Sequence, residues 1–536
     1  MIRSGRIPVG EPVSKDFAIT LSGRPAQAYY ARVSAIPYNR DWPGHQRELD
    51  QTELVSILSF SMDETVEIQI KPAKPFSNAV IRPLSSKLRP EIQAGTICLT
   101  IEQPGQYTLE LDGTHHVLHI FADPAVDYSD VKAEENLLYY GAGMHYIGQV
   151  ELMDNTAVYI DRDAFVYGAF YGVGAENIRI FGEGVLCGSW ENRQDHNFIF
   201  PYDVSRIPEH MWGREGLHHV FGHKPQVEEV GDGTVYVPGT GTMLYQSRQQ
   251  FKKRMEQGCL VKSGLHFYAC RNVSVSGITV RDAAGLSNTY AACDGVSYDN
   301  VKIVGMWRYN SDGIDLYNCC NCLVKNCFVR TFDDGICVKG QTGWDIYNAE
   351  NILVEKCVVW NEWGHSLEVG VDTVATEIRN ITFRDCDCIH HAHSVMDIGN
   401  WDRARIHDVV FENIRVEYSV SDLMPVLQTA DTDRFVAYPY ASPLFSCTVN
   451  DPHFWSCDNI RGRNYDILVK DIQVLADYEM EFPEVIIMGI DEQHQCEHIV
   501  FENITINGKK IVALEEMRLQ TNAFVKHIVL RDREEC

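Results

Sequence analysis

Three aspartates in two short segments of this 536-residue chain are the residues best placed to do chemistry. Asp312 closes the run Asn-Ser-Asp before a glycine, and Asp333 and Asp334 form a doublet that is also followed by glycine. Asp312 and Asp333 lie 21 residues apart, so a coil of about that length would stack them on neighbouring strands, roughly 4.8 Å apart. Acids this close cannot all ionise without mutual repulsion, so at least one pKa should rise. That is the condition for a general acid beside a general base.

Either segment alone would also suit a simple turn, because Asp-Gly pairs are common in turns. Two segments in register favour a site, since aligned like charges destabilise a fold unless they serve a function. Later segments add a histidine, which could hold a proton or contact a sugar hydroxyl, and polar and aromatic groups suited to sugars. The predicted substrate-binding residues are His365, Asp315, Glu368, Asp397, Asn400, Trp401 and Lys339.

The segment that carries these residues is a repeat. From about residue 140, an Asn, Asp or His precedes a short β-branched run at 177, 272, 300, 351, 380, 408, 466, 498 and 527. Between 272 and 408 these starts are 21 to 30 residues apart when Asn321 is counted. Such a period, almost without helical periodicity, is typical of a right-handed parallel β-helix. Asn tolerates left-handed backbone at turns, so we interpret the repeated Asn as structural.

The first part of the chain follows a different pattern. Alternating runs such as Phe17–Leu21, separated by Pro and Gly turns, predict a β-sandwich over residues 1–125. Residues 126–536 are assigned to the β-helix, so the expected fold class is all-β.

Two stretches, at about 190–262 and 420–463, break the repeat. Both are rich in aromatic residues, the second containing Tyr438, Tyr440, Phe445, Phe454 and Trp455. Long insertions in a solenoid usually emerge on one face and are often functional. We expect both to wall the acidic groove, where their aromatics would stack on sugars. Packing against the body of the β-helix is an equally weighted alternative.

Charge and cysteine content narrow the class of protein. The chain has 74 Asp and Glu against 47 Lys and Arg, a formal net charge of −27. Such a chain is a poor partner for nucleic acid or an anionic membrane. No secretory signal or membrane span is visible, which predicts a cytoplasmic protein whose 17 cysteines are free thiols. Those in apolar strands (Cys327, Cys337, Cys357, Cys386) should fill the core, and no metal site is expected. The long acidic body is compatible with a dimer or trimer.

The acidic segments resemble a known family. The phrase Asn310-Ser311-Asp312-Gly313, the Asp333-Asp334 doublet, the step Gly364-His365 and the 21-residue gap are similar to polygalacturonases, glycoside hydrolase family 28. The all-β domain ahead of the helix is more similar to the dextranase and isopullulanase group, family 49. The resemblance is clearest from 140 to 420 and implies an inverting hydrolase of oligo- or polysaccharides. By that resemblance, Asp333 protonates the leaving oxygen, Asp312 and Asp334 activate water, and no metal or cofactor is needed.

One segment departs from the family pattern. Polygalacturonases carry an Arg-x-Lys pair, about one coil after the histidine, that grips the substrate carboxylate. Here that stretch reads Met396-Asp397-Ile398-Gly399-Asn400, while Arg403 and Arg405 lie downstream, outside the motif. Together with the net charge, this favours a neutral glycan. The alternatives are a pectin-type hydrolase, a polysaccharide lyase, a fructan-type transferase and a non-catalytic glycan-binding solenoid. The lack of a basic cluster counts against the lyase.

Overall fold

The structure is a computed structural model that describes residues 2–40, 49–189, 264–283, 285–341, 343–428, 432–450, 456 and 460–531, and the backbone of four strands between 198 and 245. Its elements are β-strands and a few short 3-10 turns, such as Leu84–Ser86. The predicted all-β class is confirmed. No helix in the described ranges is long or apolar enough to cross a membrane.

The N-terminal domain consists of two sheets packed against each other. One sheet contains β1 (Arg3–Ser4), β4 (Tyr29–Ser34), β6 (Thr52–Met62), β8 (Ala79–Arg82), β11 (Gly105–Leu111) and β12 (Val117–Pro124). The other contains β2 (Phe17–Leu21), β3 (Arg24–Ala26), β7 (Val66–Pro72), β9 (Glu91–Gln93) and β10 (Thr96–Ile101). Alternate residues of β7 are buried, and they join a core to which both sheets contribute. The predicted sandwich is confirmed.

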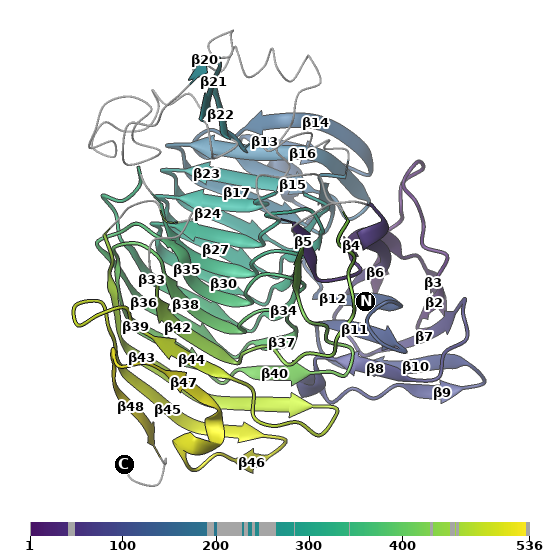
Figure 1. Ribbon diagram of the computed structural model, residues 1–536. Helices are drawn as coiled ribbons and strands as arrows, with labels where there is room; N and C mark the ends of the chain where they lie inside the picture. The colour runs from purple at the N-terminus through teal and green to yellow at the C-terminus, as the bar shows by residue number, and fades with distance from the viewer. Residues whose placement is uncertain are drawn as a thin grey trace.

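A sheet of 31 strands forms the second domain, from β13 (Leu137–Tyr140) to β48 (Val525–Arg531). Most strands pair in parallel with the strand three places further on, so three strands complete one coil (Figure 1). For example, β29 (Ile314–Tyr317) pairs with β32 (Ile336–Gly340), which pairs with β35 (Leu367–Thr373). Inward-facing apolar residues stack from coil to coil in one long core. The predicted right-handed parallel β-helix is confirmed.

The repeated Asn residues lie at turns with left-handed backbone, as predicted. Their φ angles are 55° at Asn272, 56° at Asn321 and 59° at Asn351. Their amides also stack, since Asn351 Nδ2 donates to Asn321 Oδ1 at 3.3 Å and Asn380 Nδ2 donates to Asn351 Oδ1 at 3.2 Å. Asn300 shares this left-handed backbone, with a φ of 55°, but it lies at a different corner of the coil from the others. Arg271 pairs with Asp294, so a glycine at 295 follows Asn272 on the next coil.

The described cysteines are free thiols, most of them buried. Cys327, Cys357 and Cys386 are fully buried in the core of the β-helix, as predicted. Cys337 is an exception to the prediction. It alternates with the core residues Ile336 and Val338 along β32 and therefore faces away from the core.

The structure describes more of the second insertion than of the first. The side chains of the first, at 190–262, lie outside the described residues. In the second, β41 (Val426–Gln428) pairs with β5 (Tyr38–Arg40) of the N-terminal domain, and the Phe435 ring lies 5.7 Å from that of Tyr38. Phe445 is not a wall residue, because it is fully buried in the core at the start of β42 (Phe445–Val449). Phe454 and Trp455 lie outside the described residues.

Candidate active site

The acidic residues gather on one outer face of the β-helix. Asp315 of β29 pairs with Cys337, Cys337 pairs with Glu368 of β35, and Glu368 pairs with Asp397 of β38 (Met396–Asn400). Their neighbours on either side point into the core, as alternation along a strand requires. The four side chains therefore form one row across successive coils.

A second row lies in the turns that lead into these strands. Gly313 N donates to Asp334 O at 2.8 Å, and Gly335 N donates to His365 O at 2.7 Å. With Ile314 paired to Ile336, the register places Asp334 beside Asp312. The 21-residue spacing had paired Asp312 with Asp333, and that register is wrong by one residue. The predicted proximity of the acids holds.

The glycine after each acid allows the coils to approach closely. A Cβ at Gly313 would lie 2.3 Å from the carbonyl oxygen of Gly335, and a Cβ at Gly335 would lie 2.5 Å from that of Ser366. Both contacts involve backbone that cannot move aside. Packing between coils, and not only the turn itself, therefore requires glycine at both positions.

Lys339 holds three of the acids together. Its Nζ lies 2.9 Å from Asp312 Oδ2, 3.0 Å from Asp334 Oδ2 and 3.2 Å from Asp315 Oδ1. Lys339 and Asp315 are both buried, so their contacts are with protein charges. The predicted contact of these two residues with substrate stays a prediction, and the described contacts of Lys339 are with the three carboxylates.

His365 continues the second row on the next coil, beside Asp334. Its Nδ1 lies 3.1 Å from Glu368 Oε1 and 3.5 Å from Asp334 Oδ1, and its Nε2 lies 3.8 Å from Asp397 Oδ1. Burial opposes the charged imidazolium, but Asp397 and Glu368 outweigh it and raise the pKa of His365 well above its usual value. Glu368 is fully buried behind the ring, so it orients His365 and does not meet substrate.

The pKa values of Asp333 and Asp334, the two members of the aspartate doublet, are shifted in opposite directions. Burial, together with Asp312 and Asp334, raises the pKa of Asp333 well above its usual range. Burial also opposes ionisation of Asp334, but Lys339 and His365 outweigh it and lower the pKa of that carboxyl. The surroundings therefore favour the protonated form of Asp333 and the carboxylate form of Asp334. Burial raises the pKa of Asp312 as well, although Lys339 opposes that rise.

The remaining predicted binding residues separate into two groups. Asn400 is fully buried, and its amide bonds Thr373, Ala404 and Asn464, so it is a structural residue and the prediction of sugar contact is wrong. Asp397 faces His365 at the site. Trp401 is half-buried, and its Nε1 lies beside Gly399 near Asp397.

An aromatic row beside the acids was missed from the sequence. Tyr309, Phe332 and Trp363 lie on successive coils with ring centroids 6.1 Å apart at each step, and His393 continues the row 5.2 Å from Trp363. Trp363 and His393 are half-buried, while the other two are buried. The signal was present, since an aromatic residue comes directly before each of the segments that supply Asp312, the doublet and His365.

The same centre includes the described residues that could hold a metal ion. Asp334, His365 and Glu368 each bring one ligand atom within 4.8 Å of the others. A metal requires a neutral imidazole, and the raised pKa of His365 keeps a proton on that ring. Metal binding would therefore have to displace that proton.

The downstream arginines do not enter the site. Arg403 pairs with Asp345, and Arg405 Nη2 lies 2.5 Å from Glu377 Oε1. In the part of the chain that the structure describes, the ion pairs of the clustered acids are made with Lys339 and His365.

Comparisons with known proteins identify a family and a fold to which this chain is similar. The family described as glycosyl hydrolases family 28 matches residues 220–426, a segment that contains every acid described above. No curated protein matches the chain. Dex49A from Penicillium minioluteum has a similar structure, with a TM-score of 0.60 at 13% identity over 98% of this chain and 96% of that one. That match spans both domains and shows that the fold is shared.

Two further solved structures are similar over a smaller part of the chain. A hyperthermoactive exopolygalacturonase from Thermotoga maritima is 17% identical over 74% of this chain and 84% of its own, with a TM-score of 0.43. A polygalacturonase from Erwinia carotovora ssp. carotovora is 12% identical over 76% of this chain and 94% of its own, with a TM-score of 0.42. The family match over the acidic segments confirms the predicted resemblance to family 28, and the chain is a glycoside hydrolase.

Proposed function

We propose that this glycoside hydrolase cleaves a neutral oligo- or polysaccharide with inversion at the anomeric carbon. The observation that supports the proposal most strongly is the unequal pairing of the doublet: Asp334 Oδ2 lies 3.0 Å from Lys339 Nζ and its Oδ1 lies 3.5 Å from His365 Nδ1, whereas no described ion pair joins Asp333 to either cation. Asp333 has a raised pKa and Asp334 has a lowered one, although they are neighbours in the chain. Titratable neighbours whose pKa values are pushed apart are the usual arrangement of an acid and a base in one site.

Each residue has one task in this reaction. Asp333 donates its proton to the glycosidic oxygen as the bond from that oxygen to the anomeric carbon breaks. Asp334 takes a proton from the water that attacks the anomeric carbon from the opposite face, and Asp312 orients that water. Lys339 keeps Asp334 ionised until it accepts that proton, which must return to solvent or to Asp333 before the next turnover. One displacement gives a free hemiacetal of inverted configuration and leaves Asp333 to be reprotonated.

The charges around the site support a neutral substrate. Two cations, Lys339 and His365, face the acids of the site, and both are already paired with acids of this group. The acids are Asp312, Asp333, Asp334, Glu368 and Asp397. A uronate carboxylate entering this site would meet like charge without a free cation among the described contacts of the acids.

A pectin-type hydrolase is the second candidate, and it is supported by the family match and by the names of two similar structures.

A lyase is supported less well. It would need a base to remove a proton next to a uronate carboxylate. Burial opposes the charge on Lys339, but Asp312 outweighs it and raises the pKa of this amine well above its usual value, so Lys339 stays protonated.

A product assay tests the proposal. The purified chain would be offered matched neutral and uronic oligosaccharides, and both reducing ends and the absorbance of unsaturated sugars would be recorded. We expect new reducing ends from a neutral glycan and no absorbance. Asp333→Asn should abolish the signal, whereas the surface control Asp294→Asn should not. Unsaturated product would overturn the proposal in favour of a lyase, and turnover of uronic substrates alone would overturn the neutral assignment.

A further inference from the structure

The N-terminal domain docks on the strands that lead into the active-site loops. β31 (Phe328–Thr331), β34 (Val358–Asn361) and β37 (Asp387–His390) run directly into the segments that follow them in the site. Figure 1 shows β11 and β12 of the N-terminal domain beside β34 and β37. An apolar cluster joins the two domains, including Val33, Ile57, Phe121, Phe328, Trp360 and Ile389.

Glu362 links one of these loops to both domains. Its Oε1 accepts a hydrogen bond from Arg330 Nε at 2.8 Å, and its Oε2 accepts one from the backbone N of Ser34 in β4 at 2.9 Å. Arg330 is buried, stacks on Trp360 at 3.7 Å and lies 3.1 Å from His119 Nε2. A shift of the N-terminal domain relative to the β-helix would therefore move Glu362.

Asn361, the residue before Glu362, holds the catalytic segments by their backbone. Its Nδ2 donates to Asp333 O at 2.6 Å and to His365 O at 3.3 Å, and its Oδ1 accepts from Trp363 N at 3.2 Å. The side chain is 2% exposed. One buried amide thus ties together the general acid, the histidine and the aromatic residue.

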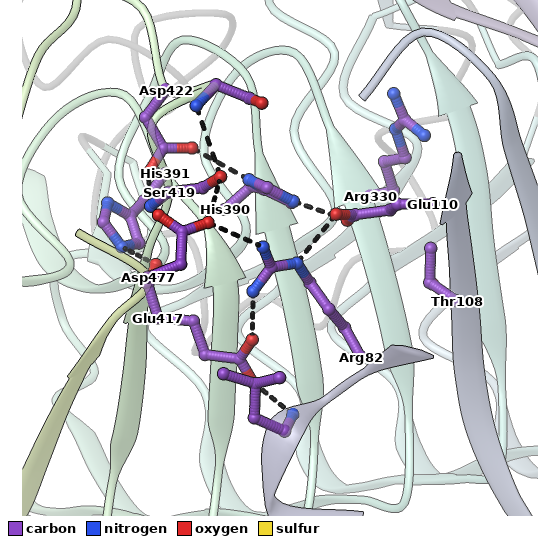
Figure 2. A network of polar contacts seen from close by, with 12 residues as sticks. Arg82, Thr108, Glu110, Arg330, His390, His391, Glu417, Ser419, Asp422 and Asp477 are labelled. Atoms are coloured by element: carbon purple, nitrogen blue, oxygen red, sulfur yellow. Dashed lines mark hydrogen bonds and ion pairs between the residues drawn. The ribbon is translucent and has the colours of Figure 1, made fainter. Parts of the chain in front are cut away.

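A second anchor holds the next coil. Figure 2 shows His390, at the end of β37, between Glu110 of β11 and Asp422, and its ring nitrogens lie 2.6 and 2.9 Å from the two carboxylates. Arg82 of β8 lies beside it and pairs with Glu110 at 2.8 Å and with Glu417 at 2.5 Å. The N-terminal domain therefore binds the ends of two successive strands that enter the site.

We propose that the N-terminal domain positions the general acid. Ser34 of this domain bonds Glu362, and its His119 contacts Arg330 of β31, which also bonds Glu362, the residue just after β34. Asn361 then sets the backbone of Asp333 and His365. This inference rests on the proposed function for the role of Asp333. Asn361 and Glu362 are positioning residues, since they bond the loops and not the reacting atoms. Misplacing a catalytic group by about 1 Å can cost on the order of 100-fold in rate.

The kinetic test uses Asn361→Ala and Glu362→Ala in the full chain. We expect kcat to fall by roughly 10- to 100-fold with KM nearly unchanged. The alkaline limb of the pH profile should move to lower pH, because a looser Asp333 meets more water and its pKa falls. Glu362→Gln, which keeps an acceptor for Ser34 N, should recover part of the rate. Asn351→Ala and Glu355→Ala, which alter an outer turn and an outer ion pair of the same β-helix, are the controls. An unchanged kcat and pH profile would overturn the inference.

Hydrogen exchange gives a readout that needs no substrate. Amides of 332–335 and 362–366 should exchange at least about tenfold faster in Glu362→Ala, with 377–384 unchanged, because the loops lose their anchor. Equal exchange in the variant and the parent would overturn the positioning role, whatever the activity. A parent that cleaves nothing in the panel would instead count against the proposed function, and the exchange data would still decide the inference. Should Glu362→Ala fail to fold, Glu362→Gln takes its place.

Discussion

Asp312 and Asp334, on neighbouring coils, share one cation. Lys339 Nζ lies 2.9 Å from Asp312 Oδ2 and 3.0 Å from Asp334 Oδ2. The register of the β-helix brings the two carboxylates together, and the ammonium offsets the repulsion that would follow. Asp333, next in the chain, takes no part in this pairing, and burial together with Asp312 and Asp334 raises its pKa. This contrast within one turn is the physical basis of the proposed acid and base.

Replacing the proposed acid, the proposed base or the water-orienting Asp312 should abolish turnover without unfolding the chain. We expect Asp333→Asn, Asp312→Asn and Asp334→Asn each to reduce kcat by about 10²- to 10⁴-fold, the usual contribution of a positioned acid or base. For Asp333→Asn the melting temperature should stay close to that of the parent, because a neutral amide replaces an acid whose raised pKa favours its neutral form. Steady-state kinetics and thermal melts check both statements. A variant with near-normal kcat would remove that aspartate from the catalytic set.

Lys339→Met should destabilise the fold and shift the pH profile. The change leaves three buried carboxylates without their shared cation, and breaking a buried ion pair from one side typically costs about 3–5 kcal/mol. The pKa of Asp334 should then rise, so the acid limb of kcat/KM should move to higher pH. Urea unfolding and a pH–rate profile measure the two effects. Stability equal to that of the parent chain would show that Lys339 does not hold the acids together.

The charge on His365 should give a pH-dependent part of the stability. Its folded pKa is raised above the unfolded value of about 6.5, so its contribution is fully present below that pH. The contribution is lost as the pH rises through the folded pKa. The melting temperature of the parent should therefore exceed that of His365→Gln most at about pH 6, and the gap should shrink towards alkaline pH. We expect His365→Ala to lower kcat less than the aspartate variants. A gap that widens with pH would contradict the assignment of charge.

Trp363 should contribute to substrate binding. It is one of the two half-buried members of the aromatic row, and its ring stacks on that of Phe332. Loss of one aromatic stacking contact is worth about 0.5–1.5 kcal/mol, so Trp363→Ala should raise KM by roughly 3- to 10-fold with a smaller effect on kcat. Trp363→Phe should recover most of the affinity. Unchanged KM in the alanine variant would assign the ring to packing alone.

Much of the fold could be predicted because the β-helix repeats locally. The Asn residues mark turns through their own tolerance of left-handed backbone, and that property does not depend on distant contacts. The register could not be predicted to the residue, because coil length varies and strand pairing decides it. Hence Asn300 and the partner of Asp312 were both misplaced by sequence spacing.

Within the site, residue types predicted which side chains would gather but not what each would contact. Lys339 and Asn400 were both read as substrate contacts, yet each is buried with protein partners. Asn361 and Trp363 were missed because their roles depend on neighbours from adjacent coils. Such roles follow from packing across coils, which spacing along the chain does not report.

The measurement that tests the central claim most directly is NMR of the first product formed from a cleaved neutral oligosaccharide, before mutarotation. The account predicts a new hemiacetal of inverted anomeric configuration, and its loss in Asp333→Asn. A product that retains configuration would contradict direct displacement by water and the roles assigned to Asp312, Asp333 and Asp334.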